Sequence, residues 1–289
     1  MENQNILWKQ LTQTYNPKLN DALQHQHQAA QFIALIGKHL VPQQSDDSNT
    51  NMEFVFDKNI LVGNPFPGGF RVGLNLIDLK LIILNHESLS INEISLDGKN
   101  KQEVFDELKT ALSNAGVDTS KFSLELHYEI PEHPIDKGAA FSLKNRATFV
   151  ENTKYRHNAE IIIQEIIENI ADAEAVRIWP HHFDTGSFVA LSKSKEGQLM
   201  QSIGLGFAIP DAMIDEPYFY LSFWSEKPIE RTKNMETLQN GKWMMPDWNG
   251  GVLRLSDILT QTSAQKQHEF VRSFFKQGID FLLKHLKSN

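Results

Sequence analysis

The stretch that decides the fold class is residues 197–224, GQLMQSIGLGFAIPDAMIDEPYFYLSFW. It contains two apolar runs separated by a segment with two prolines and three carboxylates. In the first run, large side chains alternate with the small ones of Ser202, Gly204, Gly206 and Ala208. Because neighbouring side chains of a strand point to opposite faces, this alternation predicts strands of an antiparallel sheet.

The second run places a hydrogen-bonding aromatic face beside this row of small residues. Tyr218, Tyr220, Ser222 and Trp224 share one face of the predicted strand. Aromatic side chains with polar tips are typical of ligand pockets. Glycine inside a strand leaves space that either a ligand or a cross-strand tyrosine ring fills, and the sequence is compatible with both.

The rest of the chain alternates helical and strand patterns. Helices are predicted over 17–40, 100–116, 153–171 and 263–286, and strands near 52–57, 69–76, 79–85, 122–130, 175–183 and 185–193. The predicted class is therefore α+β, with mainly antiparallel sheet flanked by long helices. We expect a single domain, either undivided or built from two similar packed lobes of residues 1–150 and 151–289.

Composition excludes several classes of function. The chain has no cysteine, which rules out disulfides, thiolate zinc ligands and cysteine nucleophiles. Its net charge is -8 and its basic residues are scattered, so we expect neither nucleic acid nor a membrane as a partner. No apolar run reaches the roughly 18 residues of a membrane span, and the polar amino terminus has no leader pattern. A cytoplasmic protein is expected.

The most chemically suggestive segment is WPHHFDTGSF, residues 179–188. If it is extended, Trp179 and His181 face one way, whereas His182 and Asp184 face the other. Asp184 would then orient His182 as a general base, a general acid or a metal ligand. A third ligand at a suitable spacing is not visible, so no metal site is predicted. The alternative is a structural core motif in which the histidines are satisfied packing residues.

Two functions follow from these patterns. The first is a small-molecule pocket with His182, Asp184 and Glu216 as catalytic candidates and with ligand-binding residues Trp179, His181, Tyr218, Tyr220, Trp224 and Trp243. Residues 242–251 would pack over this pocket as a lid. The second is a non-catalytic binding or interaction module. The sequence indicates no particular cofactor or oligomeric state, and the HQH motif at 25–27 is expected to be solvated on a helix surface.

Three pieces of the chain resemble a bacterial family known only as a domain of unknown function. They are FIALIGKHLVP in the first helix, IWPHHFDTG with Phe183 and Asp184, and GFAIPDAMIDEPYFYLSFW with Phe219 and Tyr220. The order of the pieces agrees over most of the chain, although GFAIPD lacks the Pro-Gly of the family pattern. The resemblance implies one fold that spans the chain, with Phe183, Asp184 and Tyr220 in its central motif, and it implies no activity.

Overall fold

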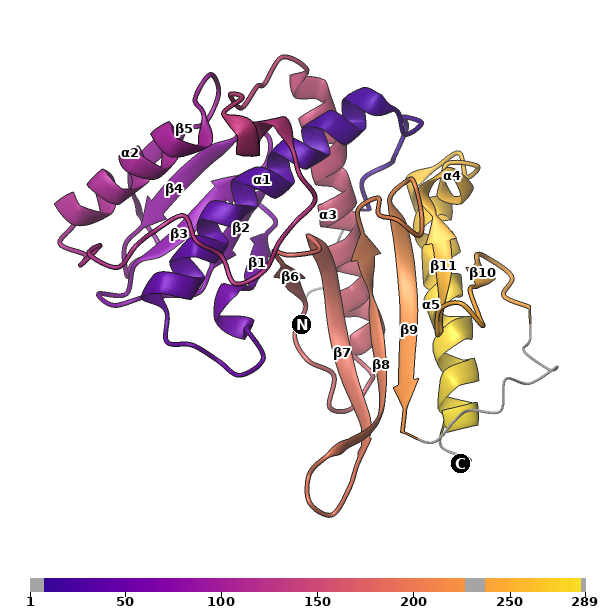
Figure 1. Ribbon diagram of the computed structural model, residues 1–289. Helices are drawn as coiled ribbons and strands as arrows, with labels where there is room; N and C mark the ends of the chain where they lie inside the picture. Colours follow the sequence, from indigo (N-terminus) through magenta and orange to yellow (C-terminus); the bar gives the residue numbers. More distant parts are fainter. Residues whose placement is uncertain (1–7, 227–236, 287–289) are drawn as a thin grey trace. The chain divides into compact units, whose positions relative to one another are not determined.

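Antiparallel strand pairing organises both units of the computed structural model, which describes residues 8–226 and 237–286 (Figure 1). Unit 1 comprises Met1–Tyr15, Lys154–Val176 and Asp184–Asn289, and unit 2 comprises Asn16–Thr153 and Arg177–Phe183. The predicted α+β class with mainly antiparallel sheet is confirmed. The division differs from a single cut at residue 150, because the first fifteen residues group with the second half of the chain and residues 177–183 group with the first half.

The strands of unit 2 follow the spatial order β6-β1-β2-β3-β4-β5, with antiparallel pairing between neighbours. They are β1 (Met52–Val55), β2 (Ile60–Gly63), β3 (Arg71–Asn75), β4 (Lys80–Leu84), β5 (Ser90–Ser95) and β6 (Arg177–Trp179). The strands expected near 52–57, 69–76 and 79–85 are thus present, and β2 and β5 are additional. Two short 3-10 helices, η1 (Ser48–Thr50) and η2 (Pro134–Lys137), lie in the connections.

Two helices pack on these strands. Helix α1 (Pro17–Leu40) begins at Asn16, whose side chain accepts hydrogen bonds from two backbone amides, and it lies against β2 and β3. Helix α2 (Lys101–Asn114) begins with a reciprocal capping box between Asn100 and Glu103 and packs near β5. The chain turns out of α2 at Gly116, whose φ of 85° is the left-handed conformation that glycine adopts without strain.

The polar side of α1 is buried, so the expectation that residues 25–27 are solvated was wrong. His25 is 6% exposed and His27 is 3% exposed. The strand expected at 122–130 is also absent, because this segment is irregular. Within unit 2 it supplies a partner for α1 instead, since the Tyr128 hydroxyl donates to Gln31 Oε1 at 2.8 Å. A later part of the same connection contacts His25 through the rings of His133 and Phe141.

Unit 1 contains a second antiparallel arrangement in the order β7-β8-β9-β11-β10. Its strands are β7 (Asp184–Lys193), β8 (Leu199–Ala208), β9 (Tyr218–Ser225), β10 (Lys242–Trp243) and β11 (Gly250–Arg254). The helices are α3 (Arg146–Ile167), which enters unit 1 at Lys154, α4 (Leu255–Ile258) and α5 (Ala264–Leu286). None of the helices in the described residues is long and apolar enough to cross a membrane.

One face of the unit 1 strands forms an apolar core with the helices, as the alternation predicted. The large residues of β8 and β9 cluster with side chains of α3, α4 and α5, and they are Ile203, Leu205, Phe207, Phe219, Leu221 and Phe223. In Figure 1, α3 and α5 lie along the same side of β7, β8 and β9. The opposite face carries Asp184, the small residues of β8 and the tyrosines of β9, and we call it the tyrosine face.

Acid is expected to destabilise unit 2 through His25. Burial lowers the pKa of His25; Asp21 and Asp97 oppose the shift, and His133 adds to it. The folded state therefore binds a proton less readily than the unfolded chain, so this contribution to stability is complete above the ordinary histidine pKa of about 6.5 and is lost as the pH falls below it. We expect the midpoint of urea unfolding to decrease between about pH 7 and pH 5.

Replacing the buried imidazole tests this explanation. The variant His25→Gln should show a weaker pH dependence than the natural protein, because one of the groups that titrates differently in the two states is gone. The matched control is His182→Gln, since His182 is exposed. Equal pH dependence in His25→Gln and in the natural protein would contradict the assignment.

Candidate functional site

The predicted site residues fall in both units. Trp179, His181 and His182 belong to unit 2, whereas Asp184 and all the later candidates belong to unit 1. Within the described residues, no group of three or more histidine, aspartate or glutamate side chains is arranged to hold a metal ion.

The WPHHFD segment is not extended throughout, which corrects the prediction of opposite-facing histidines. Strand β6 ends at Trp179, residues 180–183 form a turn, and β7 begins at Asp184. The chain turns with Phe183 at a φ of 50°, in the left-handed region that a large side chain seldom adopts. As a result the rings of His181 and His182 lie together, with centroids 4.4 Å apart.

The residues of this turn have different environments. Phe183 is buried and stacks on His27 of α1, with ring centroids 5.1 Å apart. His181 is half-buried between Trp179 and Tyr128. The His182 side chain is exposed, and neither of its ring nitrogens forms a hydrogen bond within the part of the chain that the structure describes. The turn is thus anchored by Phe183.

The centre of the tyrosine face is a hydrogen bond between Tyr220 and Asp184. The Tyr220 hydroxyl donates to Asp184 Oδ2 at 2.6 Å, and burial, followed by the negative charge of Asp184, raises the pKa of Tyr220 well above its ordinary value. The ring crosses Gly206 and Gly186. A Cβ on Gly206 would lie 2.5 Å from Tyr220 Oη and 2.6 Å from the Thr185 carbonyl oxygen. The tyrosine ring therefore fills the space above the glycines.

A second tyrosine–aspartate pair lies beside the first. The Tyr218 hydroxyl donates to Asp211 Oδ2 at 2.7 Å, and the other oxygen of Asp211 accepts the amides of Met213 and Ile214. Burial, reinforced by Asp211, raises the pKa of Tyr218. The rings of Tyr218 and Tyr220 meet edge to face at 6.5 Å. Both phenols are held in their neutral, hydrogen-bond-donating form.

A buried arginine supports this site from the helix side. Arg156 of α3 is 1% exposed, its Nη1 donates to Thr185 Oγ1 at 2.9 Å, and its guanidinium lies over the Phe207 ring. Burial lowers the pKa of Arg156 to about 9, and the charge of Asp184 partly opposes this shift. Arg156 therefore remains a cation at neutral pH and stabilises the carboxylate at the start of β7.

A second arginine reaches the tyrosine face from β11. Arg254 pairs directly with Tyr218 across the strands, and the alternate residue Val252 clusters with Tyr218 in the same layer. Arg254 is half-buried, and its Nε is buried with no hydrogen-bond partner in the described residues. Neither Arg156, Asp211 nor Arg254 was identified from the sequence. The strand register is what brings Arg254 to the tyrosines, and a single sequence does not display this register.

The segment expected to act as a lid covers part of this face. Met244 and Trp248 pack in the cluster around Tyr218, together with Met213. The Trp248 ring lies directly over Gly250, and its centroid is 6.4 Å from that of Tyr220. The tyrosines thus have an apolar and aromatic surround.

Three further predicted residues of unit 1 lie away from the two tyrosine–aspartate pairs. The Glu216 carboxylate accepts hydrogen bonds from the Ser256 amide at 2.7 Å and from its hydroxyl at 2.8 Å, so it caps the start of α4. Trp224 lies on the tyrosine face near the far end of β9 and is 44% exposed. Trp243 of β10 packs on the helix side instead, with its ring 5.4 Å from that of Phe281.

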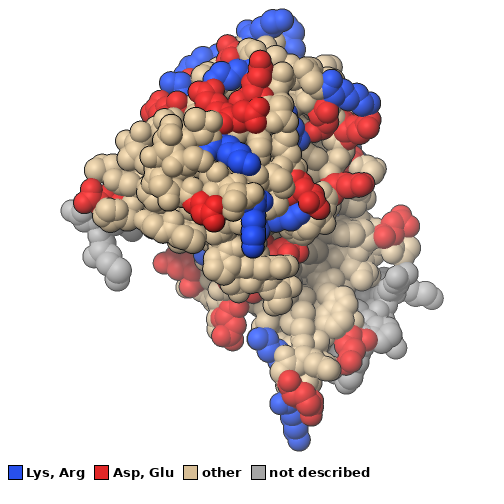
Figure 2. Space-filling view, turned by 60° about the vertical axis from the view of Figure 1, so that its left-hand side comes forward, with Lys and Arg blue, Asp and Glu red and all other residues tan. Residues whose placement is uncertain are grey.

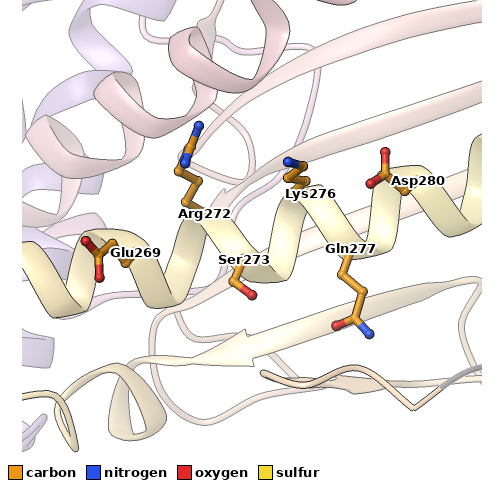
Figure 3. A pocket seen from close by; sticks show the side chains of 6 residues that line it. All are labelled: Glu269, Arg272, Ser273, Lys276, Gln277 and Asp280. Atoms are coloured by element: carbon orange, nitrogen blue, oxygen red, sulfur yellow. The ribbon is translucent and has the colours of Figure 1, made fainter.

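A shallow groove follows the outer side of α5 and is lined by Glu269, Arg272, Ser273, Lys276, Gln277 and Asp280 (Figure 3). In this view Arg272, Lys276 and Asp280 project from one side of the helix, and Ser273 and Gln277 project from the other. Every described residue that lines it belongs to α5, and none of the predicted site residues is among them. A ligand there would remain largely in water.

An adjoining groove of about 500 Å³ separates α5 from the end of α3. Isoleucines of both segments line it, and charged side chains surround them. Two of these charges are paired with each other, since Glu165 accepts Arg272 Nε at 2.6 Å; Glu165 also accepts His268 Nε2 at 2.7 Å. None of the site residues predicted from the sequence is among the described residues that line this groove.

Comparisons with known proteins provide no relative, because no family model, no curated protein and no solved structure matches the chain. The resemblance to a bacterial family of unknown function therefore stays a prediction.

Substitutions on the tyrosine face are expected to rank by what they disturb. Gly206→Ala should be the most destabilising, because its Cβ would collide with the Thr185 carbonyl, which belongs to the backbone and cannot rotate away. Tyr220→Phe should cost about 1 to 3 kcal/mol, since it removes a hydrogen bond to a carboxylate. His182→Ala should stay within about 0.5 kcal/mol of the natural protein because the residue is exposed.

Urea unfolding of the three variants measures this order. A Gly206→Ala protein as stable as the natural one would show that the Thr185 carbonyl and the Tyr220 ring do not lie as close to Gly206 as described. A large loss in His182→Ala would restore the interpretation of His182 as a buried structural residue.

Proposed function

We propose that the protein binds a small molecule on the tyrosine face of unit 1. The observation that carries this proposal is the pair of neutral phenols, Tyr218 and Tyr220, each held by a carboxylate and surrounded by aromatic and methionine side chains. A few fixed polar groups in an apolar surround are what orient a bound ligand. The helices of unit 1 pack on the opposite face, and the tyrosines belong to a separate, smaller apolar cluster with Val252.

Binding is favoured over catalysis in this proposal. Asp184 and both tyrosines are fixed by hydrogen bonds, which suits recognition. His182 was the expected base, and no carboxylate or carbonyl in the described residues holds its imidazole. A general base needs a defined orientation toward the proton that it removes, so we assign no chemical step to His182.

The same proposal places the protein in the cytoplasm. Its support is the absence of cysteine from the sequence, which suits a reducing compartment.

The surface carries mixed charge, and Figure 2 shows acidic and basic side chains interspersed over the face in view. A small uncharged or weakly charged partner fits such a surface better than a polyanion does.

Ligand-observed NMR with a library of defined fragments tests the binding proposal. We expect several aromatic fragments to bind the natural protein and to lose about tenfold or more in affinity in Tyr220→Phe, because the variant lacks the phenol hydroxyl and its Asp184 is no longer held by it. The matched control is Trp243→Phe, an aromatic change on the helix side of the same strands. Fragments that bind equally to Tyr220→Phe and fail with Trp243→Phe would move the site away from the tyrosine face.

The alternative, an interaction module, is favoured by one observation in unit 2. Strand β5 is the last strand in its order, and Leu89 and Ile91 at its start are 58% and 46% exposed. An unpaired strand edge with exposed apolar side chains can accept an extended peptide.

If β5 binds a peptide in this way, Ile91→Lys should abolish the binding of a partner chain in a pull-down experiment and leave fragment binding on the tyrosine face unchanged. Partner binding that survives this change would reject the alternative.

A further inference from the structure

Arg254 is the one charged group of the tyrosine face whose role the fold does not explain. Its buried Nε has no hydrogen-bond partner, and no carboxylate in the described residues is paired with its guanidinium. A buried donor without a partner is costly, and native structures leave few of them. The neighbouring Asp211 carboxylate binds Tyr218 and two backbone amides instead of Arg254.

We propose that Arg254 recognises the carboxylate of the ligand, an inference that rests on the small-molecule site proposed above. The guanidinium fork matches a planar carboxylate with two parallel hydrogen bonds. A phosphate fits less well, because a doubly charged group would meet only this unpaired cation while Asp184 and Asp211 lie on the same face.

Asp184, on the first strand of the tyrosine face, indicates which second polar group the ligand carries. Asp184 uses Oδ2 for Tyr220, and its Oδ1 has no hydrogen-bond donor in the described residues. Asp184 is half-exposed, so this oxygen can accept a hydrogen bond from a ligand. β7 and β11 are three strand positions apart, roughly 14 Å at the backbone, and the long Arg254 side chain shortens this gap.

A small amino or hydroxy acid with an apolar body is the ligand class that can bind both Arg254 and Asp184. Its carboxylate binds Arg254, its hydroxyl or ammonium group donates toward Asp184, and its body lies on the partly exposed rings of Tyr220 and Trp248. The aromatic surround accommodates a ring or a branched chain. No covalent step is part of this inference.

Calorimetric titration with four probes tests the inference: lactate, 3-phenyllactate, phenylalanine and 2-phenylethanol, which lacks a carboxylate. We expect 3-phenyllactate or phenylalanine to bind about tenfold or more tightly than 2-phenylethanol, and Arg254→Gln to abolish that preference. Arg254→Lys should restore it only in part, since a lysine cannot form the bidentate contact. The control Arg272→Gln removes an arginine on α5 and should leave binding unchanged.

The outcomes separate the two proposals. If 2-phenylethanol binds as tightly as the acids and its affinity depends on Tyr220, the site is real and the role of Arg254 is overturned. If inorganic phosphate shifts the side-chain NMR signal of Arg254 Nε as strongly as the carboxylates do, the assignment to carboxylates is overturned. If none of the four probes binds, both the role of Arg254 and this ligand class are rejected, while aromatic fragments that depend on Tyr220 would still support a small-molecule site.

Discussion

The hydrogen bond between Tyr220 and Asp184 determines how the tyrosine face is built. The two residues lie on β9 and β7, so the tyrosine ring must cross the strand between them. It can do so only because Gly206 and Gly186 have no Cβ under the ring. Glycine weakens a strand, and here the loss is offset by the burial of an aromatic ring and by a charge-assisted hydrogen bond. Tyr218, the lid segment and Arg254 are arranged around this contact.

The start of β7 is held from both faces at once. Asp184 points to the tyrosine face and is bound by Tyr220, whereas the next residue, Thr185, points to the helices and is bound by Arg156. The alternation of a strand makes this possible with two adjacent residues. The buried Arg156 also neutralises part of the charge of Asp184, which reduces the cost of keeping a carboxylate against an aromatic ring. Rigidity at this point suits a site that must present fixed polar groups.

The sequence predicts features that depend on neighbouring residues, such as the faces of a strand. It does not predict features that depend on contacts between distant segments. Alternation in β8 correctly assigned Gly204 and Gly206 to one face, because period two is a property of the strand itself. The turn at 180–183 was missed since Phe183 adopts a positive φ that its side chain does not signal. The burial of His25 depends on a covering segment more than 100 residues later, and the place of Arg254 depends on the register of β11 with β9.

The charges of the tyrosine face are arranged differently from a purely structural network. Each aspartate is paired with a tyrosine, although an arginine stands one strand away from Tyr218 and would form a stronger ion pair. Stability alone would favour pairing Arg254 and would not leave its Nε buried and unsatisfied. Proteins tolerate such a cost mainly where preorganised groups serve a ligand, because the binding energy then recovers what the free protein loses. Under the proposed binding function, Arg254, which has no carboxylate partner in the described residues, and the two neutral phenols act together as one set of recognition groups.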